Sequence, residues 1–240
     1  MRILPMLKYI FSLVLFASFA QAQEQKKDSV VFVDRYGLRL GTDIYKLTRN
    51  IYDKDYKGFE FNADFRVTKK IYAAAELGFE NKRTLDDRLD YNTQGTFVKV
   101  GANYNFYENW LDMDNQIFIG GRYAFGLFEQ QLNAFRVYQI NPPAGENPFI
   151  NPIDFKSEAL TAHWFEIVLG FQAELLPNIY GSLQARLNYM FTQDRPDNFD
   201  NLYINGFGRV YEGSSFGASF NYSLSYFLPL IKKPKKKVEE

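Results

Sequence analysis

The chain has 240 residues, with 28 Lys and Arg, 28 Asp and Glu and no Cys, so its formal net charge is zero. This balance produces no global field that would favour a nucleic-acid partner, and a disulfide framework is excluded. Aromatic residues make up 18% of the chain, which is typical of proteins whose aromatic side chains mark two membrane interfaces.

The first 22 residues have the pattern of an export signal. Arg2 and Lys8 precede a run of about a dozen apolar residues, and Ala20-Gln21-Ala22 matches a small-x-small cleavage site. The apolar run is shorter than the roughly 20 residues that a membrane-spanning helix needs. We therefore expect residues 1–22 to be removed and residues 23–34 to form a periplasmic N-terminal segment.

Residues 59–67 alternate strictly between apolar and polar side chains. One face carries Phe59, Phe61, Ala63, Phe65 and Val67, and the other carries Glu60, Asn62, Asp64 and Arg66. A strand places these two sets on opposite sides. Because four polar side chains cannot line a dry core but can line the inside of a barrel whose outside faces lipid, the pattern predicts a membrane barrel rather than a soluble sandwich.

Seven further segments follow the same pattern. The eight expected strands are residues 36–47, 57–67, 71–80, 93–106, 116–128, 161–175, 179–191 and 216–228. Short connections (68–70, 107–115 and 176–178) alternate with long ones (48–56, 81–92, 129–160 and 192–215), as in barrels with short periplasmic turns and long outer loops. The prediction is an all-β, single antiparallel transmembrane barrel over residues 35–230 in the outer membrane of a Gram-negative bacterium, followed by a basic periplasmic tail, residues 231–240. Ten strands is the alternative count, because residues 134–140 offer another pairing segment.

Charged side chains are expected to line the lumen as a polar network. Its predicted members are Arg39, Asp43, Glu60, Asp64, Arg66, Glu76, Glu80, Lys99, Arg122, Glu166, Glu174 and Arg186. An eight-stranded barrel is only wide enough for its own side chains, and unpaired buried charges are very costly. We therefore expect these charges to pair and close the lumen; the alternative is a path for protons or small solutes.

The chain offers little for catalysis. Its single His, His163, begins the sixth expected strand at the outer rim and faces the lipid or headgroup side by strand parity. Asp194, Asp197 and Asp200 lack the alternating spacing of an EF-hand loop, which favours a solvated loop. We expect no catalytic, cofactor or metal site, and keep a lipid-modifying enzyme that uses His163 as an alternative.

The expected outer loop 129–160 contains three Asn-Pro steps, which stiffen it without regular structure. Its aromatic side chains either fold onto the barrel rim or meet a partner, and the basic tail is either solvated or drawn to anionic lipid. Possible partner contacts are Phe135, Tyr138, Phe149, Phe155, Lys232, Lys233, Lys235, Lys236 and Lys237. In the last loop, Asn205-Gly206 is typical of a tight hairpin, expected above the membrane.

The chain resembles an uncharacterised family of small outer-membrane barrels from Bacteroidota that carry a domain of unknown function. The resemblance rests on the export signal, on the opening segment 33–39 (Val-Asp-Arg-Tyr-Gly-Leu-Arg), on the Glu-rich second and third strands, on the Asn-Pro loop and on the basic end. It implies an outer-membrane location and favours an accessory barrel in a larger complex. We therefore expect a non-enzymatic scaffold or interaction subunit that contacts lipid and other outer-membrane or surface proteins; a small-solute channel is the alternative.

Overall fold

The computed structural model describes residues 33–86, 89–108, 114–136, 149–150, 155–197 and 199–234. The expected export signal, residues 23–32, Tyr138 and Lys235, Lys236 and Lys237 lie outside these ranges. No helix within them is long and apolar enough to cross a membrane.

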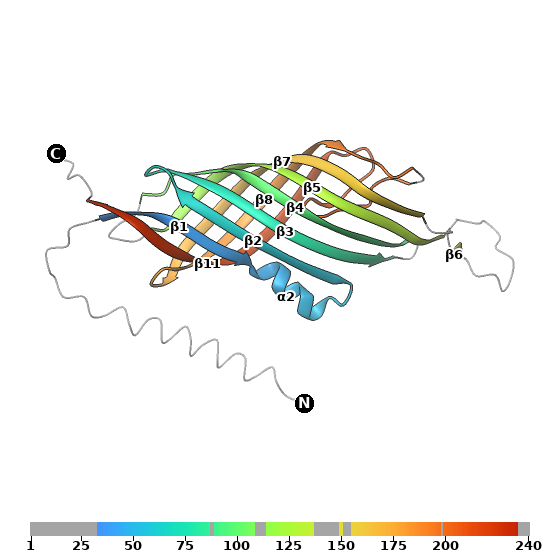
Figure 1. The fold of residues 1–240 in the computed structure, drawn as a ribbon, viewed down its shortest axis with the longest axis horizontal. Helices are drawn as coiled ribbons and strands as arrows, with labels where there is room; N and C mark the ends of the chain where they lie inside the picture. Colours follow the sequence, from blue (N-terminus) through green and yellow to red (C-terminus); the bar gives the residue numbers. More distant parts are fainter. Residues whose placement is uncertain are drawn as a thin grey trace, which may run out of the picture. The chain divides into compact units, whose positions relative to one another are not determined.

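Eight long antiparallel strands close into a ring (Figure 1). They are β1 (Val33–Asp43), β2 (Tyr56–Arg66), β3 (Ile71–Leu85), β4 (Leu89–Asn105), β5 (Gln116–Arg136), β7 (Phe155–Leu176), β8 (Ile179–Gln193) and β11 (Phe216–Pro234). The order β4-β3-β2-β1-β11-β8-β7-β5 is closed by pairing of β4 with β5. Three short strands, β6 (Phe149–Ile150), β9 (Tyr203–Ile204) and β10 (Gly208–Arg209), and helix α2 (Ile44–Tyr52) complete the described elements. The eight-stranded barrel is confirmed.

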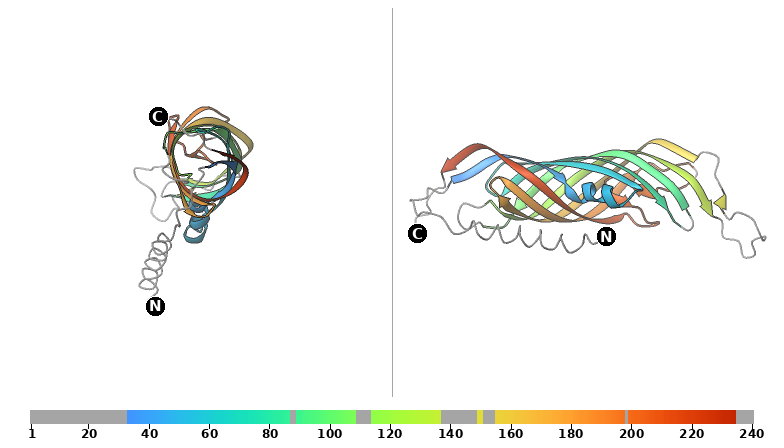
Figure 2. Two further views of the ribbon diagram at one scale, coloured as in Figure 1. Left: turned by 90° about the vertical axis from the view of Figure 1, so that its left-hand side faces the viewer. Right: turned by 90° about the horizontal axis from the view of Figure 1, so that it is seen from below.

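The wall of the barrel is apolar outside and largely polar inside. Phe61, Leu77 and Leu169 on the outer face are each more than half exposed, whereas Glu60 and Glu76, their neighbours in sequence, are buried. Viewed along its axis, the wall surrounds a narrow interior (Figure 2). Because the ring closes, strand backbones pair laterally around it, which is what a strand-built wall in lipid requires.

Several strands run further than the alternating pattern predicts. β5 continues to Arg136 and β7 begins at Phe155, so much of the expected loop 129–160 is paired strand. β3 and β4 are likewise joined across residues 86–88 rather than across 81–92. The ladder needs only backbone partners, so it continues past the point where the outward side chains stop being apolar. Ala134–Arg136 extend β5, and no ninth or tenth strand enters the ring of the described residues.

The strands also exceed the expected barrel limits, residues 35–230. β1 starts at Val33 and β11 ends at Pro234, so residues 33–34 and 231–234 belong to strands rather than to the N-terminal segment and the tail. The Asp34 side chain is buried and lies 3.6 Å from Arg66, so this second residue of β1 faces the barrel interior.

The first expected strand is wrong at its end. After Asp43 the chain turns into α2, whereas residues 44–47 were predicted to extend (Figure 1). Asp43 caps the helix: its Oδ1 accepts a hydrogen bond from the Lys46 N–H at 3.3 Å. Ile44, Leu47 and Ile51 follow helical spacing, and this local signal outweighs the period-two pattern.

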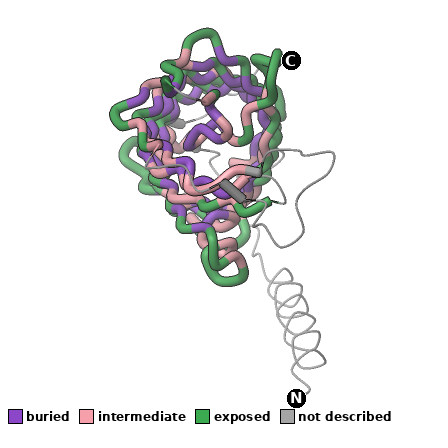
Figure 3. Tube along the Cα trace, turned by 90° about the vertical axis from the view of Figure 1, so that its right-hand side faces the viewer, coloured by how far each residue is buried: buried purple, intermediate pink, exposed green. Residues whose placement is uncertain are grey.

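The hairpin around Asn205-Gly206 forms as predicted, and it folds inward instead of projecting away from the barrel. β9 and β10 pair as Ile204 with Gly208 and Tyr203 with Arg209, and Ile204 and Asn205 are fully buried. The hairpin folds into the ring, where Figure 3 shows buried segments inside the wall. Ile204 and Phe207 are apolar, and the interior offers them an apolar surface, so burial is favoured over exposure.

Candidate functional site

The structure places all twelve charged residues of the predicted lumen network in the barrel interior. Ten are buried, and Asp64 and Glu174 are partly buried with side chains 17% and 19% exposed. They form two clusters and a separate Arg39–Asp64 pair rather than one network, and the chain supplies further members that the alternating pattern did not single out.

The central cluster fills the middle of the barrel. It consists of four basic and five acidic side chains: Lys46, Lys99, Arg122, Arg186, Asp43, Glu60, Glu76, Glu80 and Glu166. Arg186 joins two carboxylates, with its Nη1 2.5 Å from Glu76 and 3.1 Å from Glu166. Lys99 lies 2.8 Å from Glu166, and Arg122 lies 3.4 Å from Glu76. Opposite charges from β3, β4, β5, β7 and β8 thus meet at the axis.

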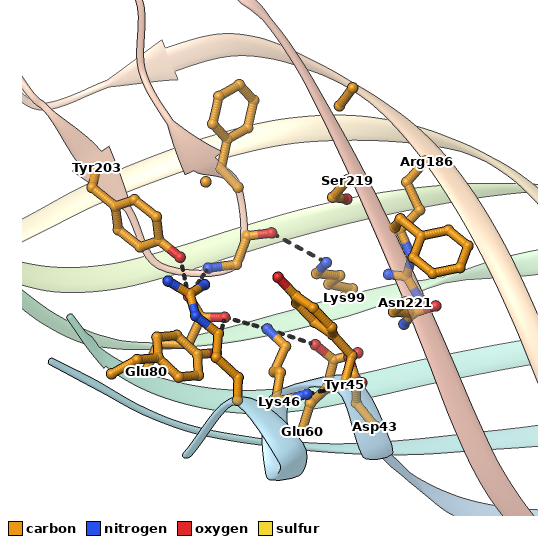
Figure 4. Close-up of a pocket in the computed structure, with 17 residues that line it drawn as sticks. Asp43, Tyr45, Lys46, Glu60, Glu80, Lys99, Arg186, Tyr203, Ser219 and Asn221 are labelled. Atoms are coloured by element: carbon orange, nitrogen blue, oxygen red, sulfur yellow. Dashed lines mark hydrogen bonds and ion pairs between the residues drawn. The ribbon is translucent and has the colours of Figure 1, made fainter. Parts of the chain in front are cut away.

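Glu80 ties the cluster to α2 and to the inward hairpin (Figure 4). Its carboxylate pairs with Lys46 of α2 and accepts hydrogen bonds from the hydroxyl of Tyr203 at 3.0 Å and the N–H of Gly206 at 3.1 Å. The Asn205 side chain donates to the Glu80 carbonyl at 2.9 Å. A single β3 carboxylate therefore fixes two elements that lie far away in the sequence.

A second cluster lies toward the end that carries the Pro177-Asn178 turn. Arg35 contacts Asp114 at 2.9 Å and Glu174 at 3.2 Å, and Arg66 lies 3.5 Å from Asp114. Separately, Arg39 pairs with Asp64 at 2.6 Å. Asp34, Arg35 and Asp114 were not predicted members; they sit at or beyond the strand ends, where the alternating pattern carries no weight.

An apolar layer closes the other end of the interior. Trp164 is fully buried and its indole N–H donates to Glu166 at 2.8 Å, while its ring lies edge-on to Phe207, with centroids 5.9 Å apart. Phe97, Phe128 and Met190 complete the contact with the hairpin. The lumen is therefore occupied by ion pairs in the middle and by packed aromatic side chains above them.

Sequence reasoning missed the residues that link these layers. The alternating pattern places Lys46 in a strand, and it places Tyr203, Asn205 and Gly206 in the last outer loop. The helical spacing after Asp43 would have pointed Lys46 inward, opposite Ile44 and Ile51. No local signal predicts that the hairpin turns inward, because its partners come from five different strands.

His163 lies in an aromatic group on the outer side of β7. Its Nδ1 is 2.7 Å from the Tyr123 hydroxyl, and its ring centroid is 4.9 Å from Phe125 and 6.1 Å from Phe191. In the loop after β8, Asp194 accepts two hydrogen bonds from Thr161, which hold the pKa of that carboxyl below its usual range. Asp194 is thus engaged with β7, and no group of three His, Cys, Asp or Glu among the described residues is arranged to hold a metal ion.

Two of the possible partner contacts pack on the rim. Phe135 and Phe155 lie against a cluster of Tyr91, Leu132 and Tyr203 and are partly buried. Phe149 belongs to β6, which pairs with the end of β5. The side chains of Phe149, Lys232 and Lys233 lie outside what the structure describes.

Residues 3–233 match the model of a family described as Domain of unknown function (DUF6048). The chain belongs to this family. The DUF6048 chain is also similar to the crystal structure of Neisserial surface protein A, with 10% sequence identity and a TM-score of 0.42, over 82% of this chain and 99% of that chain. No curated protein matched it. The expected membership of a family of unknown function is confirmed, and the Bacteroidota origin stays a prediction.

Proposed function

We propose that this DUF6048 protein is an outer-membrane barrel that does not conduct and does not catalyse, and that it serves as a scaffold or interaction subunit of a larger outer-membrane complex. The filled lumen carries the proposal: the Arg186-centred ion pairs and the apolar layer around Trp164 occupy the cross-section of a barrel that has room only for its side chains. The outward aromatic setting of His163 is that of an interfacial residue and supports a non-enzymatic role.

Planar-bilayer recording tests the closed lumen. Purified full-length protein should give no stable unitary conductance, because water and ions would have to displace buried ion pairs that hold each other in place. A porin inserted in the same bilayer serves as the positive control for detection. Reproducible single-channel steps from the monomer would contradict the proposal and establish the small-solute channel instead.

Affinity purification from native membranes tests the interaction role. We expect specific proteins to copurify with the wild type and to be lost from Phe149→Ser, because large rigid side chains carry a disproportionate share of binding energy. Phe155→Ser is the control for rim packing, since Phe155 already contacts the rim cluster. If Phe149→Ser retains the same proteins, a Gln variant of Lys235, Lys236 and Lys237 tests the basic end; if neither changes the set, these contacts are wrong.

A further inference from the structure

The barrel wall has an interruption between β2 and β11. β1 lies between these strands, and its last pair with β2 is Thr42 with Phe61. On the other side β1 neighbours β11, and a Cβ added at Gly41 would meet the Leu224 carbonyl, so the last residues of β1 lie close to this part of β11. Beyond that point, no strand of the described residues lies between residues 56–60 of β2 and 216–221 of β11.

Helix α2 closes this interruption with side chains instead of a ladder. On the β2 side, the Asn50 amide both donates to the Gly58 carbonyl at 2.8 Å and accepts from its N–H at 2.7 Å, so it imitates a strand partner. On the β11 side, the contacts are the Thr48 and Tyr222 hydroxyls at 2.8 Å and the Tyr45 and Tyr222 rings at 6.0 Å. We call this junction between α2 and β11 the seam.

A cavity of about 330 Å³ lies behind the seam (Figure 4). Its inner lining includes Asp43 and Glu60 of the central cluster. Its lining also includes Ala218 and Phe220, which belong to the outward, lipid-facing set of β11 and are exposed. The cavity therefore runs from the polar interior to the outer surface of the wall.

Three buried oxygen atoms that belong to residues of the cavity lining lack hydrogen-bond partners in the described part of the chain. They are Asp43 Oδ2, Glu60 Oε1 and Asn221 Oδ1, and the three residues are 0%, 2% and 7% exposed. Buried acceptors without donors are costly, so such a set calls for an occupant that donates hydrogen bonds.

The charges point to a cationic donor. The central cluster contains five carboxylates and four basic groups. Lys46 pairs with Glu60 and Glu80, and the Asp43 carboxylate forms no salt bridge with the residues that the structure describes. At the cavity rim, Arg49 is already paired with Asp53 at 3.0 Å. A single positive charge in the cavity would balance the cluster, and a primary ammonium group offers three N–H donors for three unpartnered acceptors.

We propose that the cavity behind the seam binds a primary ammonium group, carried by a lipid headgroup that enters from the membrane between α2 and β11. The ammonium donates to Asp43, Glu60 and Asn221, and the acyl chains stay in the bilayer beside Phe220. The same chemistry occurs in soluble amines, which would have to reach the cavity from water. This binding is independent of whether the barrel acts as a scaffold or as a channel.

Native mass spectrometry of the purified full-length barrel tests the proposal with three lipids of equal chain length. Phosphatidylethanolamine carries N–H donors, phosphatidylcholine carries the same charge without them, and phosphatidylglycerol carries no ammonium group. We expect phosphatidylethanolamine to be retained at least about tenfold more tightly than the other two, because hydrogen bonds to charged groups are the strong ones. Equal retention of all three lipids would overturn the proposal.

Variants locate the binding. Glu60→Gln removes the charge of one acceptor, and Ser219→Trp fills the cavity from β11 without removing a charged group. Each should abolish the preference while heat-modifiable gel mobility is kept. Asp64→Asn, a carboxylate inside the barrel but outside this cavity, is the control and should keep the preference. An unchanged preference in both Glu60→Gln and Ser219→Trp would overturn the assignment. Displacement of the lipid by millimolar ethanolamine would support binding of an ammonium group and would indicate that a soluble amine, rather than a lipid headgroup, carries it.

Discussion

Arg186→Gln should destabilise the barrel by about 3–5 kcal/mol, the cost of leaving buried charges without their partner. Arg186 is 5% exposed and bridges Glu76 and Glu166, so its loss leaves five carboxylates facing three basic groups in the central cluster. Gln keeps much of the length of the side chain, which limits the effect of lost packing. Urea unfolding of the protein inserted in lipid vesicles, followed by gel mobility, measures the change in the free energy of unfolding.

A second substitution separates charge from shape in this experiment. Adding Glu166→Gln to Arg186→Gln removes one of the carboxylates that lost its partner. The double variant should therefore be more stable than the sum of the two single effects predicts. Arg195→Gln is the control, because Arg195 pairs with Asp200 at the surface, where both side chains are more than half exposed, and surface pairs contribute little. Additive effects of Arg186→Gln and Glu166→Gln would show that the two residues do not form the buried pair described above.

Gly206→Ala should destabilise the inward hairpin by about 1–3 kcal/mol more than Gly213→Ala, the range typical of overpacking in a filled interior. Both glycines have positive φ, 81° and 74°, so both substitutions carry the same backbone cost. A Cβ at Gly206 would lie 2.5 Å from the Phe97 ring, whereas a Cβ at Gly213 would meet nothing within 4 Å. The difference between the two variants therefore isolates the packing of the hairpin inside the barrel.

Tryptophan fluorescence gives the matching local measurement. In a Trp110→Phe background, emission comes from Trp164 alone, which packs against Phe207 of the hairpin. Gly206→Ala should shift this emission to longer wavelength as water reaches the indole, and Gly213→Ala should leave it unchanged. Equal stability and equal emission of the two variants would contradict an inward hairpin.

The outward and inward faces of the strands follow from the sequence because alternation is a local property. In β5, Ile117, Ile119 and Tyr123 are exposed and Arg122 is 2% exposed, as the period-two pattern predicts. The same rule fails at strand ends. Alternation does not show that β1 ends and α2 begins after Asp43, because Asp43 is both an inward-facing strand residue and the N-cap of the helix.

What fills the interior was decided by tertiary structure. Alternation in sequence shows that Glu76 and Arg186 point inward, but it does not pair residues that are 110 positions apart. The packing of Ile204 and Phe207 in one buried cluster with Trp164 likewise depends on the interior space that several strands enclose together. The sequence by itself thus determined a closed barrel with an apolar outside and a charged inside, since each side chain obeys the parity of its own strand. Only the tertiary structure decided which charges neutralise each other, which loop closes the lumen and where the wall is sealed by a helix, because these depend on distances between strands that no local pattern encodes.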